Sequence, residues 1–370
     1  MEGNQIPKSK VKKHPPLPRL LSKEVTHKCT CKSRSSPIQT GRRAFELAQE
    51  YSISNSRLAL GSALFLGSML ALNQIQGASA ADFTFTDEGT LVTAVGGANS
   101  DVGTAPTRII FDGAAGRTIT ADGPVVFTDR AVSIGSPISS TFTLTAASSF
   151  VGNCLICSNS NLTLNNVVLD VAPKAGVSAI SVDAAAPVTV ILNNVEVKNV
   201  SGAAAITVTG QAETTVTIND SNIHNNTAAV APNGGGTGGS VIVISAGSVG
   251  ATVTLTNTAI TTNTAGAGLL GGDGGSVVAV SAASGDVTVS TTDVTITGNT
   301  AGAGTTGSGG DGGSGGSVVV VNSTTGAATV TLTNTDITTN VAGLGVGAGA
   351  GGSIIEVLSL IHISEPTRPY

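Results

Sequence analysis

The chain has 370 residues, of which 48 are Gly, 11% are charged and only 3% are aromatic, with no Trp. A core of large side chains is therefore excluded, and burial must come from Val, Ile, Leu, Ala and Thr in bulk. The net charge of −5 combines a basic segment, residues 1–57, with an acidic body, residues 81–357, that holds 5 basic and 18 acidic residues. Such a body repels nucleic acid and anionic membranes, so no nucleic-acid partner is expected.

The first 80 residues are typical of an export signal with an extension. Residues 1–57 are basic and Pro-containing and are predicted to be disordered. The segment is either an extended signal or the product of a start codon that is assigned too early. An apolar run follows at Leu58–Leu72, and a small-x-small site ends at Ala80. Residues 58–80 are therefore predicted to be a secretory signal peptide, since the run is short for a spanning helix. A buried core helix is the alternative.

Two cysteines, Cys154 and Cys157 in "NCLIC", are the only pair of the predicted mature chain. A Cys-x-x-Cys pair forms a redox motif, half a zinc site or a structural disulfide. Zinc is disfavoured because the predicted mature chain has no second Cys pair and His224 is its one histidine before the tail. A structural disulfide or two buried thiols are favoured over redox chemistry, and an exported chain is oxidised.

A repeat dominates the second half of the chain. The motif "Ile-x-x-Asn" begins at Ile223, Ile260, Ile296 and Ile337, with spacings of 37, 36 and 41 residues. Its asparagines are Asn226, Asn263, Asn299 and Asn340, and each is followed by a Gly-rich stretch and then "Gly-Gly-Ser-Val" or "Gly-Gly-Ser-Ile". Looser copies begin at Leu162 and Val188.

Each repeat contains short β-branched runs that alternate with Thr or Asn, which is the period-2 pattern of strands. Three strands per repeat without a helical period predict an all-β, right-handed parallel β-helix of the pectin-lyase-like type. Residues 81–160 are expected to form its opening coils and residues 161–357 its regular repeats. Equivalent residues then stack, so the four isoleucines form an inward ladder and the four asparagines form a ladder of hydrogen-bonded amides.

The Gly-rich stretches are predicted to be loops that leave one corner of every coil, between the asparagine ladder and the next strand. Gly274 and Gly275 suit a sharp re-entry with positive φ, and Ser276 is small enough to begin a crowded strand. Because the loops vary in length while the strands keep register, variation is confined to one face.

The paired motifs resemble Phe-x-x-Asn and Gly-Gly-Ala-Ile/Leu/Val of the polymorphic outer-membrane protein repeat, with Ile for Phe and Ser for Ala. The resemblance covers about residues 223–357 and implies a secreted autotransporter-type passenger on the cell surface or outer membrane. It implies an adhesive role toward a host-cell, matrix or glycan ligand, and a C-terminal translocation barrel as partner. Neither a cofactor nor a metal is implied.

The alternative is a secreted polysaccharide lyase or hydrolase, with its groove near the stretch from Arg108 to Lys198. Its acidic residues are spread about one per coil, and Asp293 and Asp336 are expected to occupy equivalent places before the repeat motif. Asp273 and Asp311 lie in similar "GGDGG" loops but lack the nonapeptide spacing of Ca²⁺-binding repeats. His224 is interpreted as a turn residue. No catalytic residue is therefore predicted, and the non-enzymatic interpretation is favoured.

The tail "LSLIHISEPTR", Leu358 to Arg368, resembles the translated product of a common sequencing adapter and interrupts the repeat in mid-coil. Residues 358–370 are therefore expected to be an artefact, and the natural gene is expected to continue past Val357. His362 and Arg368 are excluded from chemistry on the same ground.

Overall fold

The computed structural model describes residues 81–101, 106–136, 141–231, 238–269, 272–305, 313–346 and 349–359. The basic extension 1–57, the signal segment 58–80 and residues 360–370 lie outside the described residues. The expectations for those segments therefore stay predictions.

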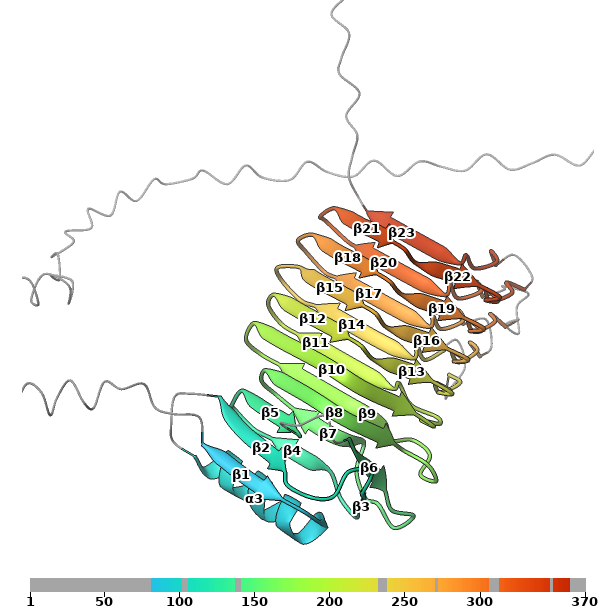
Figure 1. The fold of residues 1–370 in the computed structure, drawn as a ribbon. Helices are drawn as coiled ribbons and strands as arrows, with labels where there is room; N and C mark the ends of the chain where they lie inside the picture. The colour runs from blue at the N-terminus through green and yellow to red at the C-terminus, as the bar shows by residue number, and fades with distance from the viewer. Residues whose placement is uncertain are drawn as a thin grey trace, which may run out of the picture. The chain divides into compact units, whose positions relative to one another are not determined.

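The described strands form two long sheets in which every pairing is parallel (Figure 1). The first sheet has 15 strands: β1 (Asp82–Phe85), β2 (Thr107–Phe111), β3 (Thr118–Ala121), β5 (Val132–Gly135), β6 (Phe142–Ala146), β8 (Leu162–Asp170), β10 (Val188–Lys198), β12 (Thr214–Asn219), β13 (Asn222–His224), β15 (Ala251–Thr256), β16 (Ala259–Thr261), β18 (Val287–Thr292), β19 (Thr295–Thr297), β21 (Ala328–Thr333) and β22 (Asp336–Thr338). The second sheet has 8: β4 (Val125–Phe127), β7 (Cys154–Ser158), β9 (Ser178–Ala184), β11 (Ile206–Gly210), β14 (Ile242–Ala246), β17 (Val278–Ala282), β20 (Val319–Ser323) and β23 (Ile355–Ser359).

One repeat of the sequence contributes three strands, two to the first sheet and one to the second. The repeat around Ile260, for example, contributes β15, β16 and β17, and each pairs with its equivalent in the next repeat. Parallel pairing of strands one repeat apart confirms a β-helix or solenoid architecture, in which each coil contacts its neighbours. In the looser repeats β8 and β10 are single long strands, and β10 pairs with both β12 and β13.

Alternation of buried and exposed residues explains why these segments are strands. In β15 the inward Ala251, Val253 and Leu255 are buried, whereas the threonines between them face outward. Successive side chains of a strand point to opposite faces, so the inward rows of both sheets meet in one continuous apolar core.

The first coils contain a helix that the repeat pattern does not predict. Helix α3 (Glu88–Ser100) packs against β1, β2, β3 and β4 and buries Leu91, Ala94 and Ala98. Its start is fixed by Asp87, whose side chain accepts a hydrogen bond from the Thr90 amide while the Thr90 hydroxyl accepts from the Asp87 amide. The helix covers the apolar edge that the first coil leaves unpaired.

Candidate contact surface

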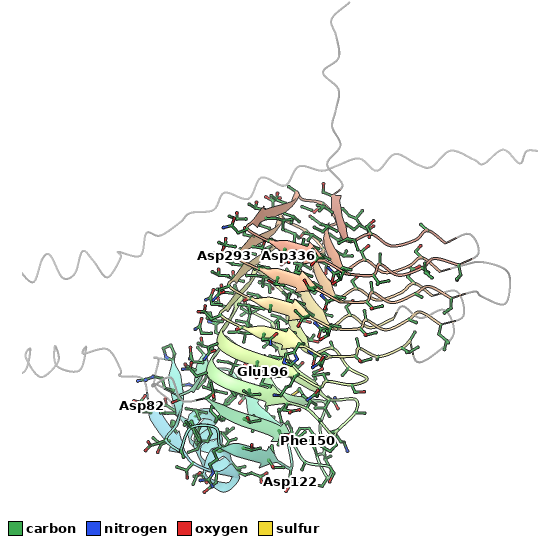
Figure 2. The ribbon with its side chains drawn as sticks, turned by 45° about the vertical axis from the view of Figure 1, so that its right-hand side comes forward. Asp82, Asp122, Phe150, Glu196, Asp293 and Asp336 are labelled. Atoms are coloured by element: carbon green, nitrogen blue, oxygen red, sulfur yellow. A yellow bond between two sulfur atoms is a disulfide. The ribbon has the colours of Figure 1, made fainter. Side chains whose placement is uncertain are left out.

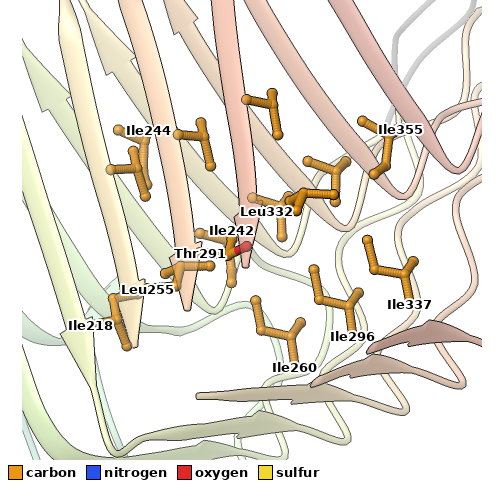
Figure 3. Close-up of a pocket in the computed structure, with 15 residues that line it drawn as sticks. Ile218, Ile242, Ile244, Leu255, Ile260, Thr291, Ile296, Leu332, Ile337 and Ile355 are labelled. Carbon is orange, nitrogen blue, oxygen red and sulfur yellow. The ribbon is translucent and has the colours of Figure 1, made fainter. Parts of the chain in front are cut away.

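The four repeat isoleucines are in register from strand to strand. Ile223 pairs with Ile260, Ile260 with Ile296, and Ile296 with Ile337. Figure 3 shows the last three in a row beside Ile and Leu side chains of the facing strands. The space between these side chains is about 20 Å³, only enough for about one water, and its lining is apolar apart from Thr291. It is a packing void of the core and not a ligand site.

The four repeat asparagines form a hydrogen-bonded ladder at the turn after the isoleucines. The amide Nδ2 of each donates to Oδ1 of the next, at 3.0 Å for Asn226 to Asn263, Asn263 to Asn299 and Asn299 to Asn340. A second Nδ2 hydrogen bond reaches a carbonyl one coil back, as from Asn263 to Ile223 at 2.8 Å. Asn263 and Asn299 are fully buried, so these contacts replace the water that their amides lose on folding.

A second ladder of Asn and Asp side chains lies between the two first-sheet strands of each regular coil and continues within the long strands β8 and β10. Its members share a positive φ of about 46 to 55° and are Asn166, Asn194, Asp220, Asn257, Asp293 and Asn334. Asn and Asp tolerate this left-handed conformation better than other non-glycine residues. The amide Nδ2 of Asn257 donates to Asp220 at 2.7 Å, and that of Asn334 donates to Asp293 at 3.1 Å.

This register corrects the expected equivalence of Asp293 and Asp336. Asp293 stacks with Asn334, whereas Asp336 pairs with Thr295 in the adjacent strand. The two aspartates therefore belong to different rows of the solenoid. An Asn or Asp stands at a constant distance before each Ile-x-x-Asn motif, and this recurrence is the sequence signal that identifies the second ladder.

The Gly-rich loops leave the coils as two neighbouring arms, one outgoing and one returning. Gly275 of a returning arm donates its N–H to the carbonyl of Gly266 in its own outgoing arm, and Gly302 of the next loop donates to Gly275. The series continues through Gly316 and Gly343 with N···O distances of 2.8 Å. The described parts of the arms are thereby joined in one zig-zag of backbone hydrogen bonds, which satisfies groups that a loop would otherwise expose to water.

The expected positive φ at Gly274 and Gly275 is wrong, since neither residue has it. A Cβ on Gly275 would overlap the backbone carbonyls of Gly238 and Gly239, and one on Gly274 would overlap that of Gly302. Glycine is needed here because backbones of neighbouring arms approach too closely for any side chain. Ser276 is buried and its N–H donates to the Ser240 hydroxyl at 3.0 Å, as expected for a crowded start of a strand.

The charged residues are not gathered into one site. Arg108 pairs with Asp82 at 3.3 Å, and Arg130 pairs with Asp101 at 3.3 Å. Figure 2 shows Asp82 and Asp122 at the first coils, Glu196 midway and Asp293 and Asp336 toward the last coils. Within the described residues no three His, Cys, Asp or Glu side chains come close enough together to hold a metal ion.

Glu196 is the centre of a small charged cluster. Its Oε1 accepts hydrogen bonds from Lys198 Nζ and from His224 Nε2, both at 2.9 Å. His224 lies in strand β13 and not in a turn, and the Asn225 amide contacts its Nδ1 at 2.9 Å. Partial burial raises the pKa of Glu196, but the two hydrogen bonds and the nearby positive charge outweigh it, so the net pKa lies below its ordinary value.

The remaining candidates lie in the first coils and in the loops. Cys154 and Cys157 are joined by a disulfide with Cα atoms 5.8 Å apart. Asp273 accepts a hydrogen bond from the Ser314 amide, whereas Asp311 lies outside the described residues. β23 includes Leu358 and Ser359, the first two residues of the segment that resembles adapter sequence.

A polar cavity of about 250 Å³ opens between β2, β5 and β8. It is lined by Arg108, Ser133, Asn165 and Asn166 among others. Asn165 donates to Ser133 at 3.3 Å, and Asn166 donates to the carbonyl of Ser136 at 3.0 Å. Lys198 lies three strands away along the first sheet, so the cavity does not bring Arg108 and Lys198 together.

Comparison with known proteins adds no relative: no family model matches the sequence, and no curated protein or solved structure matches it significantly. Among the described residues, no helix has the length and apolar character needed to cross a membrane.

Proposed function

We propose that this protein is an exported β-helical passenger that acts at the cell surface as a structural and adhesive element without catalysis. The observation that carries the proposal is the zig-zag of hydrogen-bonded glycine arms, which holds a row of loops on one side of the stack. Such an arrangement repeats one contact many times, and repeated weak contacts give high avidity toward a repetitive ligand.

Several features support the finer points of this proposal. Parallel crossovers are right-handed in almost all sheets, so a right-handed, pectin-lyase-like coil is the expected type. The Cys154–Cys157 disulfide is stable in the oxidising compartments that an exported chain enters. The resemblance to polymorphic outer-membrane protein repeats supports two further parts of the proposal, a C-terminal translocation domain and a host-cell, matrix or glycan ligand.

Expression of the gene in a Gram-negative host tests the proposal. Protease treatment of intact cells is expected to digest the repeats while a periplasmic marker stays intact. Protection of the repeats until the cells are lysed would contradict surface exposure. Binding of the purified chain to matrix-protein and glycan arrays then tests adhesion, with an unrelated solenoid protein as control.

A secreted polysaccharide lyase or hydrolase is the second candidate, and the cavity beside Arg108 is the observation that favours it. The test is incubation of the purified chain with polygalacturonate or alginate and Ca²⁺, followed by detection of unsaturated or reducing ends. Turnover that is abolished by Arg108→Ala and kept in Arg117→Ala would establish this candidate in place of the adhesin.

A further inference from the structure

The outward face of the first sheet carries a two-dimensional array of hydroxyl side chains across β12, β15, β18 and β21, which lie side by side in Figure 1. One rank contains Thr215, Thr252, Thr288 and Thr329, paired in register. A second rank, two residues further along each strand, contains Thr217, Thr254, Ser290 and Thr331. A third rank begins at Thr256.

The spacing of this array is set by the fold. Neighbouring strands of a sheet lie about 4.8 Å apart, and outward residues of one strand recur about every 6.7 Å. The buried ladders below keep the register constant from coil to coil. The hydroxyl groups therefore form a lattice whose two repeats are both close to repeats of the water oxygens on the prism faces of ice.

Strand formation alone does not explain the threonines. The outward ranks of the second sheet are mixed on equally regular strands of β11, β14, β17 and β20: one contains Thr207, Val243, Ala279 and Val320, and the other contains Thr209, Ser245, Ser281 and Asn322. On the first sheet, two ranks consist of hydroxyl side chains alone over these four strands, whereas on the second sheet the hydroxyls alternate with Val, Ala and Asn.

The chemistry of the array restricts what binds to it. Neither rank contains a charged side chain, so the complementary ligand is neutral. A ligand that binds by stacking needs aromatic rings, and neither rank contains one. A rigid field of hydroxyls, each able to donate and accept, instead matches a lattice of water molecules.

We infer that the outward face of β12, β15, β18 and β21 binds ice, through its prism faces. The inference goes beyond the proposed function, because it assigns a ligand to the outward face of the first sheet and not to the glycine arms. The array is ordered before contact, so little conformational entropy is lost on binding. The methyl groups of the threonines add apolar contact between the hydroxyls.

The experiment uses the purified full chain in an ice-affinity assay, in which protein is partitioned between a slowly growing ice hemisphere and the remaining liquid. Thr254→Lys and Thr288→Lys place charges in the array and are expected to reduce the ice-bound fraction about tenfold or more. Ala279→Lys, at an outward position of β17, is the matched control and is expected to retain binding. Circular dichroism melts of all variants report whether each one folds.

A second measurement needs no variant. A single ice crystal grown in fluorescently labelled wild-type protein is expected to fluoresce on prism planes. Exclusion of wild-type protein from ice, labelling confined to the basal plane, equal loss in the control, or binding to cellulose or chitin in place of ice would each overturn the inference. Loss of ice binding with surface exposure retained would leave the proposed surface function standing.

Discussion

Replacement of Asn263 by alanine removes one rung from the middle of the asparagine ladder. The wild-type Oδ1 accepts from the Asn226 backbone N–H at 3.1 Å and from the Asn226 amide at 3.0 Å. Its Nδ2 donates to the Ile223 carbonyl and to Asn299. Asn299 keeps a donor after the substitution, because the backbone N–H of residue 263 also reaches its Oδ1.

The substitution therefore leaves two N–H groups of Asn226 and one carbonyl lone pair without their partners in a buried site. An unsatisfied buried group costs about 1 to 3 kcal/mol. A water molecule entering the space vacated by the amide would satisfy part of this set. We expect Asn263→Ala to lower the free energy of unfolding by about 3 to 4 kcal/mol.

Urea denaturation followed by circular dichroism measures the change, and hydrogen exchange locates it. Protection is expected to fall first in β13, β16 and β19, because coils of a solenoid contact only their neighbours. Asn322→Ala is the matched control: Asn322 faces outward from β20, and its loss is expected to change stability by less than about 0.5 kcal/mol. A loss below about 1 kcal/mol for Asn263→Ala would refute the assigned role of the ladder.

Three further predictions concern other parts of the fold. Gly275→Ala is expected to lower the free energy of unfolding by about 3 kcal/mol in the same urea assay, because its Cβ would overlap neighbouring backbone. Gly96→Ala in helix α3 is expected to raise the free energy of unfolding by about 0.5 to 1 kcal/mol, because a Cβ there meets nothing within 4 Å. Phe142→Ala is expected to cost about 3 to 5 kcal/mol in thermal or urea unfolding, since it packs on two other phenylalanine rings at 4.7 and 5.3 Å. Glu196 has a lowered pKa in the folded state, so its stabilising contribution is present above its ordinary pKa of 4.5 and is lost as the pH falls through the lower folded pKa. Glu196→Gln should therefore be less stable than wild type at pH 7, and a difference that persisted unchanged well below pH 4 would contradict the assignment.

The repeat made most of the architecture predictable. Ile260 and Asn263 recur at nearly constant spacing, and a repeat of strands that lacks a helical period can bury its apolar side only by stacking. Helix α3 was harder to predict from the sequence, because Gly96, Gly97 and several β-branched residues give it a low helix propensity. It forms because tertiary burial of Leu91 outweighs propensity, and its one local signal is the Asp87-x-x-Thr90 cap.

The glycine arms show why part of the candidate site was not predictable. The sequence indicates a loop at Gly274 and Gly275, and local chain geometry suggests positive φ as the reason. The actual constraint is contact with Gly239 and Gly302, which lie in the loops before and after. Contacts between residues about one repeat apart depend on the packing of arms outside the strands, which no local pattern specifies.

Stability and recognition are assigned to different residues of the same coil. Inward isoleucines, buried amides and glycine arms fix the register, whereas outward residues such as Thr254 contribute little to the core. Because the register is held from inside, the spacing of outward groups costs no additional ordering on binding. Outward substitutions are then expected to change ligand binding without changing unfolding, and inward substitutions such as Asn263→Ala to change unfolding first. A surface built this way can change its ligand by substituting one rank of residues while every coil keeps its fold.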